Sequence, residues 1–195
     1  MLDADPSSFE VLQSGFARDK DNLFYAYNGT WSIGDEVAIE GASPTTFEKL
    51  SSRLAKDQNQ VYYLNTPTYE GFPRLRILDT VDPESFKVIF SSSFHELAID
   101  DRTVFYNGRM LLGADPNSIR TFAFSGGLFA DSDAVYVNGE VNSAINATNF
   151  DIISYGELSA IANDGKHCYL ITVSGNDGQY LEVEVLEKGC LQLNS

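Results

Sequence analysis

Hydrophobic and polar positions follow a pattern that repeats five times along this chain. Each copy places an apolar anchor before a short apolar run, and an Asp then stands four residues before an apolar residue that an aromatic follows. The anchors lie 31 to 39 residues apart, and they are Phe9, Phe47, Phe86, Ile119 and Phe150. Self-similarity at such a period is typical of repeat proteins. We therefore expect a single repeat domain over residues 1–195, with repeats of about 3–41, 42–80, 81–113, 114–145 and 146–195.

The pattern within one copy predicts short strands. Asp5-Pro6 is typical of the start of a helical turn, because proline lacks the N–H that would be unpaired there. Runs such as Phe9–Leu12 and Phe86–Phe90 have strand character. The Asp-rich segment favours a tight reversal, since Asp and Asn bind their own backbone. Asn-Gly pairs that favour hairpin turns follow the aromatic strands at residues 28–29, 107–108 and 138–139.

These elements predict an all-β fold. We expect five tandem antiparallel repeats of three strands each, introduced by short helical turns and stacked like a solenoid. The repeats shorten along the chain, which favours an open stack over equal blades. A closed five-bladed propeller is the alternative, because each repeat could supply a fourth strand.

Charge narrows the range of partners. Thirteen basic residues against 28 acidic ones give a net charge of −15, and only Lys166 and Lys188 are basic after Thr121. Nucleic acid is an improbable partner, because phosphate contacts dominate such binding. A basic protein surface or a cation is what this field attracts. There is no run of 18 apolar residues, so we expect no membrane span.

The two cysteines, Cys168 and Cys190, both fall in the last repeat. Cys190 follows the alternating, strand-like run Tyr180–Leu186. A disulfide between them would close a loop of about 20 residues, would contribute about 3 kcal/mol, and would favour an oxidising compartment. Two unrelated buried thiols are the alternative. The chain has no signal peptide pattern at its start, so we expect either a mature periplasmic protein or a cytoplasmic one.

Departures from the repeat are the candidate partner-binding residues. Two copies carry insertions with aromatic and acidic side chains, and the stretch after Thr121 is acidic. Loops carry function on a rigid scaffold, and aromatics anchor interfaces. The candidates are Trp31, Asp35, Glu36, Tyr69, Glu70, Phe72, Asp131 and Asp133.

Catalytic and metal chemistry have little support in the sequence. Asp19 and Asp21, like Asp131 and Asp133, are spaced as in calcium loops, but the closing Glu is missing and turn formation explains the recurrence better. No nucleophile elbow and no phosphate-binding Gly-rich loop occur. We expect no enzyme, no cofactor and no metal.

The motifs resemble the bacterial DKNYY repeat family. The resemblance rests on Asp-Pro-x-Ser/Thr-Phe, on Ala-x-Asp before Val-Tyr-Tyr, and on Asn-Gly. It covers about residues 3–170, although Ile119 and Ala147 depart from it. It implies an all-β repeat protein with no catalytic residues. Some members of the family resemble immunity proteins that lie beside type VI secretion phospholipase effectors. We therefore expect a non-catalytic inhibitor of such a toxin, with an envelope scaffold or a calcium- or glycan-binding module as the alternative.

Overall fold

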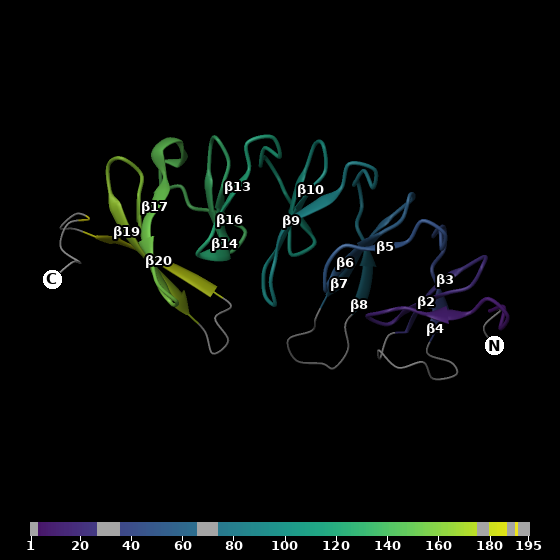
Figure 1. Cartoon of the computed structure of the whole chain (residues 1–195). Helices are drawn as coiled ribbons and strands as arrows, with labels where there is room; N and C mark the ends of the chain where they lie inside the picture. Colours follow the sequence, from purple (N-terminus) through teal and green to yellow (C-terminus); the bar gives the residue numbers. More distant parts are fainter. Residues whose placement is uncertain (1–3, 27–35, 66–73, 175–179, 187–189, 191–195) are drawn as a thin grey trace. The chain divides into compact units, whose positions relative to one another are not determined.

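The structure is a computed structural model that describes residues 4–26, 36–65, 74–174, 180–186 and 190 (Figure 1). It confirms the all-β class. The described residues form five antiparallel sheets, each with four strands paired in sequence order, and none of the sheets closes into a barrel. No helix in this part of the chain is long and apolar enough to cross a membrane.

Each sheet lies within one of the predicted repeats. The first contains β1 (Glu10–Val11), β2 (Phe16–Arg18), β3 (Leu23–Ala26) and β4 (Glu36–Ala38). The second contains β5 (Glu48–Lys49), β6 (Leu54–Lys56), β7 (Val61–Asn65) and β8 (Arg74–Ile77). The third contains β9 (Lys87–Ser91), β10 (Glu96–Ile99), β11 (Val104–Tyr106) and β12 (Arg109–Leu111). The fourth contains β13 (Arg120–Phe122), β14 (Ser125–Ala130), β15 (Val135–Val137) and β16 (Glu140–Val141). The fifth contains β17 (Asp151–Tyr155), β18 (Ser159–Asn163), β19 (Cys168–Ser174) and β20 (Tyr180–Leu186).

The prediction of three strands per repeat is wrong, because every sheet has four. The missed strand is the one that ends just before the Asp, such as β2, β6 and β10. β2 has only three residues, and the turn before it is made by Ser14 and Gly15 with positive φ. The Asp therefore directly follows a strand, and the chain reverses in the residues after the Asp.

The predicted turns are present, but they are seldom helical. The Pro-x-x segments close with bonds such as Ser8 N–H to Asp5 O and Ser118 N–H to Asp115 O. The described residues contain no α-helix, and only Ala147–Asn149 forms a 3-10 helix. Two Asn-Gly pairs, Asn107-Gly108 and Asn138-Gly139, have positive φ at both residues and join hairpin strands. Both pairs match the two-residue turn predicted for them.

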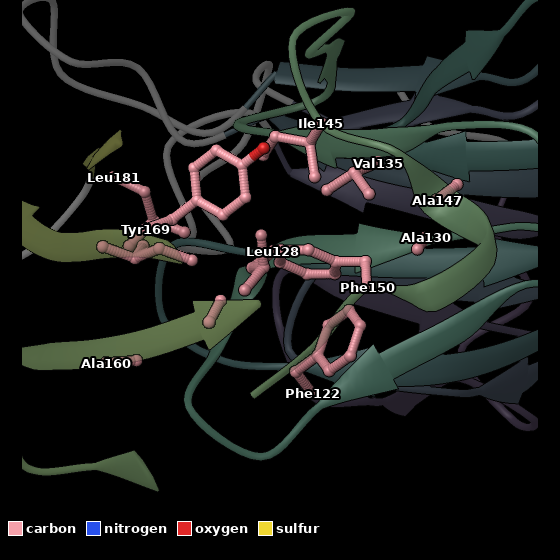
Figure 2. Close-up of a cluster of buried hydrophobic side chains, with 12 residues drawn as sticks. Phe122, Leu128, Ala130, Val135, Ile145, Ala147, Phe150, Ala160, Tyr169 and Leu181 are labelled. Atoms are coloured by element: carbon pink, nitrogen blue, oxygen red, sulfur yellow. The ribbon is translucent and has the colours of Figure 1, made fainter. Parts of the chain in front are cut away.

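The chain divides into two compact units, Met1–Val88 and Ile89–Ser195, and the division falls within β9. In the first unit, apolar side chains of the first two sheets share one buried cluster that includes Phe16, Tyr25 and Tyr62. In the second unit, one cluster joins the third and fourth sheets and another joins the fourth and fifth. Figure 2 shows the latter, in which Leu128 of the fourth sheet lies near Tyr169 of the fifth and Phe122 lies beside Phe150.

Cationic side chains link consecutive repeats through backbone carbonyls. Arg18 donates to Pro44 O at 3.2 Å, and Lys56 donates to Pro83 O and Phe86 O at 3.0 Å. Arg120 donates to Ala147 O at 2.8 Å in the second unit. Three of the 13 basic residues thus link neighbouring repeats through backbone carbonyls.

Candidate functional site

The repeated Asp organises the reversal in every repeat. One carboxylate oxygen accepts hydrogen bonds from the backbone N–H groups two and three residues later. For Asp131 these donors are Asp133, at 2.8 Å, and Ala134, at 2.7 Å. Equivalent pairs of bonds are made by Asp19, Asp57, Asp100 and Asp164. The Asp side chain therefore takes the place of a backbone acceptor in the turn.

The second oxygen of the same carboxylate reaches back to the start of its repeat. Asp131 Oδ2 accepts from Asp115 N–H at 3.1 Å and from the Tyr136 hydroxyl at 2.9 Å. Asp164 Oδ2 accepts from Asn146 N–H at 3.1 Å and from the Tyr169 hydroxyl at 2.7 Å. Asp19 and Asp57 bind the N–H groups of Asp5 and Ser43 in the same way. One buried Asp thus ties the opening turn of a repeat to its central hairpin.

This network shifts the pKa values of its members in opposite directions. Burial alone would raise the pKa of the Asp131 carboxyl, but the hydrogen bonds that it accepts outweigh burial and hold the pKa below its usual value. The same balance lowers the pKa of Asp19 and of Asp164. Burial, and then the bond to the carboxylate, raises the pKa of the Tyr136 and Tyr169 hydroxyls. The Asp residues are therefore charged and the Tyr residues neutral at neutral pH.

Asp131 is consequently part of the scaffold. Its residue is only 2% exposed and its carboxylate already accepts four hydrogen bonds. The fold therefore buries an acid that the sequence alone shows only as charged, and its contact with a partner stays a prediction. In the part of the chain that the structure describes, no three His, Cys, Asp or Glu side chains are grouped as metal ligands.

A polar pocket lies between the fourth and fifth sheets. Its volume is about 440 Å³, and it opens among the two Asp turns and the segment that connects β16 to β17. The buried residues Ile145, Ala147 and Asp164 lie beneath exposed polar side chains. Those exposed side chains are Ser132, Asp133, Ser143, Asn146, Thr148, Lys166 and His167. Of the predicted partner-binding residues that the structure describes, Asp133 is the one found at this pocket.

An apolar patch lies at the opposite end of the fifth sheet. Tyr155, Leu158 and Tyr180 are 59%, 67% and 58% exposed. Tyr155 ends β17 and Leu158 stands in the turn to β18, whereas Tyr180 begins β20 opposite Ser174. Leu158 O accepts a bond from Val173 N–H, which brings that turn beside the end of β19. We call these three exposed residues at one end of the sheet the apolar patch; the strand register places Tyr155 on the face of Ala160 and Ile171, and Tyr180 on the other face.

The patch adjoins the fourth sheet and has acidic neighbours. The Tyr155 ring lies 6.5 Å from the half-buried Phe124 ring in the β13–β14 turn. Glu157 and Glu182 are exposed beside the patch. Lys166, the one Lys or Arg among the described residues of the fifth sheet and its turns, stands in the β18–β19 turn. The end of the sheet that carries the patch therefore has acidic charge alone among its described residues.

Most of the other predicted partner-binding residues lie outside the described part of the chain. These are Trp31, Asp35, Tyr69, Glu70 and Phe72. The backbone of Glu36 pairs with Ala26 at the start of β4, and its side chain is not described. Their contact with a partner stays a prediction.

The cysteines are joined in the structure. Cys168 and Cys190 form a disulfide whose Cα atoms are 5.4 Å apart. Asn163 Nδ2 lies 3.3 Å from each sulfur atom. Cys168 follows the pocket residue His167 directly, so the bond ties residue 190 to the pocket end of the fifth sheet.

Sequence reasoning missed both the pocket and the patch. Lys166 was a signal for the pocket, because it is a rare basic residue, next to His167, in the acidic stretch after Thr121. Tyr155 and Leu158 gave no signal, since apolar residues in a β-repeat are expected to be buried. Only the pairing of β17 with β18 shows that they stand at the end of a sheet.

Comparison with known proteins identifies a family for the first third of the chain. Residues 1–66 match the model of the DKNYY family. No curated protein and no solved structure matches the chain. The matched segment contains the first repeat and most of the second, with the Asp turns of Asp19 and Asp57.

Proposed function

Because residues 1–66 place this chain in the DKNYY family, we propose that the protein is a non-catalytic inhibitor that binds another protein. In this proposal it is an immunity protein that neutralises a secreted bacterial toxin of the phospholipase type. The toxin class comes from the family resemblance. The protein-binding role has support from the surface of the molecule.

The observation that carries the proposal is the apolar patch. Exposed large apolar side chains are candidates for contact with a partner, and three of them stand at this one end of the fifth sheet. Two of the three patch residues, Tyr155 and Tyr180, are of the type that interfaces favour. Burying the patch against a partner would remove this apolar surface from water, which is favourable by about 25 cal/mol per Å².

Charge supports a basic partner. The chain carries a net charge of −15, and exposed acids flank the patch. A complementary rim of Lys and Arg on the toxin would speed association and select against acidic proteins. The insertions around Trp31 and Tyr69 are further candidates for contact.

The proposed function also implies a cellular compartment for the protein. A Cys168–Cys190 disulfide persists in an oxidising environment, which supports a periplasmic location where a secreted toxin would be met. A cytoplasmic location is the alternative. Fractionation of the native host with a thiol-labelling step distinguishes the two, since a cytoplasmic protein would carry free thiols.

Inhibition is tested by mixing the purified full chain with phospholipase-type toxins encoded in the same host. We expect loss of lipase activity at a near-stoichiometric ratio for one of them. Unchanged lipase activity across all of the toxins would reject the inhibitor proposal.

The contribution of the patch is tested with a matched pair of variants. Leu158→Ser removes a patch side chain, and Leu112→Ser makes the same change at an 86% exposed residue outside the patch. We expect the first variant to weaken toxin binding about 10-fold or more and the second to leave it unchanged. Equal effects of the two variants would exclude the patch from the interface.

A ligand-binding module is the second candidate function, and the polar pocket favours it. A pocket of about 440 Å³ with several polar side chains is of a size that small-molecule sites have. An envelope scaffold that binds calcium or a glycan would use such a site. Indifference of the melting temperature to a chelator and to calcium would remove the metal form of this candidate.

For the arrangement of the sheets we propose the open stack predicted from the sequence, with the five-bladed propeller as the alternative. Shared clusters between consecutive sheets within each compact unit support stacking in sequence order. Four-stranded sheets are also what propeller blades contain, so the strand number favours neither. Small-angle X-ray scattering distinguishes an elongated particle from a compact ring.

A further inference from the structure

Beyond Arg120, the basic side chains that the structure describes lie at the polar pocket. Among the described residues after Arg120, Lys166 and His167 are the only side chains that can carry positive charge, and both line the pocket. Three exposed acids of the fifth sheet and its first turn, Glu157, Glu182 and Glu184, do not line it. The pocket therefore holds the one Lys that the structure describes in this region, together with the acids Asp133 and Asp164.

Several polar groups at the pocket have no partner among the described residues. The hydroxyls of Ser132, Ser143 and Thr148 make no hydrogen bond within that part of the chain, and Lys166 Nζ makes no ion pair. Asn146 uses its side-chain oxygen to cap the 3-10 helix, which leaves its amide N–H groups available. One ligand could thus meet hydroxyl, amide and ammonium donors together.

The acids at the pocket limit what charge the ligand can carry. Asp164 is buried and its oxygens already accept four hydrogen bonds, three of them from backbone N–H groups. The imidazole Nδ1 of His167 lies 4.0 Å from Asp164 Oδ2. Asp133 is exposed at the rim and can accept bonds from ligand hydroxyls. Two carboxylates in the lining disfavour a dianion such as a phosphate monoester, whereas a single carboxylate can pair with Lys166.

We propose that this pocket binds a small hydroxylated carboxylate, namely an acidic sugar of the hexuronate type. Its carboxylate lies against Lys166 and His167. Its hydroxyls exchange hydrogen bonds with Ser143, Thr148 and Asp133. The volume of about 440 Å³ admits one or two sugar rings. This inference gives the second candidate function a ligand class and is independent of toxin inhibition, because the pocket and the apolar patch lie at opposite ends of the fifth sheet.

The test is a titration of the ¹⁵N-labelled full chain with glucuronate, followed by amide chemical shifts. We expect shifts at Ala144–Thr148 and at Lys166 and His167. Glucose lacks the carboxylate and acetate lacks the hydroxyls, so each should bind at least about 10-fold more weakly, since one charge-assisted hydrogen bond is worth about that factor.

Two charge-matched variants make the test specific. Lys166→Gln should weaken glucuronate binding about 10-fold or more, because it removes the pocket ammonium. Lys87→Gln removes the same charge from an exposed residue that does not line the pocket, and it should leave binding unchanged. Unshifted amides at saturating glucuronate, equal binding of glucose, or equal effects of the two variants would overturn the proposal. Loss of toxin inhibition alone would leave it intact.

Discussion

The Tyr136 hydroxyl donates a hydrogen bond to Asp131 Oδ2 at 2.9 Å, and both residues are buried. The same bond joins Asp57 to Tyr62 and Asp164 to Tyr169. The first and third repeats have Phe24 and Phe105 at the Tyr position. The Asp therefore keeps its turn in all five repeats, and the hydroxyl adds a fourth bond in three of them.

Removing the charge of this Asp should destabilise the fold. Asp131→Asn places an NH₂ group where one carboxylate oxygen now accepts from Asp115 N–H and the Tyr136 hydroxyl. We expect a loss of about 2–4 kcal/mol in the free energy of unfolding, measured by urea denaturation, because buried donors lose their acceptor.

The control for this prediction lies two residues away. Asp133→Asn makes the same chemical change at an exposed residue, and it should stay within about 0.5 kcal/mol of the wild type. A stable Asp131→Asn variant would contradict a structural role for the buried carboxylate.

Stability should depend on pH at both ends of the scale. The pKa values of Asp19, Asp131 and Asp164 are lower in the folded chain than in the unfolded one. The unfolded state then binds more protons as pH falls, so the stability that these groups supply is complete above about pH 4–5 and is lost below it. Urea midpoints measured from about pH 7 down to pH 2 should fall, and Asp131→Asn should flatten that decline.

The Tyr residues act at the alkaline end. Burial, and then the bonds to Asp57, Asp131 and Asp164, raises the pKa of Tyr62, Tyr136 and Tyr169 above the unfolded value of about 10. Their contribution is complete below about pH 10 and is lost above it, because the unfolded chain then gives up protons that the folded chain keeps. Absorbance of tyrosinate at alkaline pH should show late-titrating groups that disappear on unfolding.

Gly139 should tolerate no side chain. It has φ of +82°, and a Cβ at this position would overlap the Tyr106 ring of the third sheet. Gly139→Ala should cost about 2–4 kcal/mol, from backbone strain together with overpacking. Gly113→Ala is the matched control, since Gly113 has φ of +85° and open space around it, and it should cost only about 1 kcal/mol. Equal costs would mean that the close approach to Tyr106 is unimportant.

The disulfide should stabilise the fifth sheet. Cys168 and Cys190 are 22 residues apart, and a loop of that size is worth about 3 kcal/mol in the chain-entropy model. We expect reduction with dithiothreitol to lower the free energy of unfolding by about this amount in urea. Cys190→Ser should match the reduced wild type and should no longer respond to the reductant. A response that persists in the variant would point to another cause.

Much of the architecture could be predicted because it depends on short-range chemistry. An Asp that binds N–H groups two and three residues later, and an Asn-Gly pair with positive φ, act within a few residues and leave a periodic trace in the sequence. The five repeats, their antiparallel strands and the hairpins at Asn107 and Asn138 follow from that trace. The strand that ends just before each Asp does not, because in copies such as β2 and β6 it has only three residues, and so short a segment shows no alternation.

By itself, the sequence determined the repeat, the all-β class and the acidic balance. Only the tertiary structure decided that Asp131 is buried while Asp133 stays at the surface. The second carboxylate oxygen of Asp131 accepts a hydrogen bond from the N–H of Asp115, which is 16 residues away in the sequence. The tertiary structure also decided that Lys166 and His167 share a pocket with Ser143 and that Tyr155 remains exposed. These features depend on which sheet edges meet in space, and no local pattern of residues encodes that.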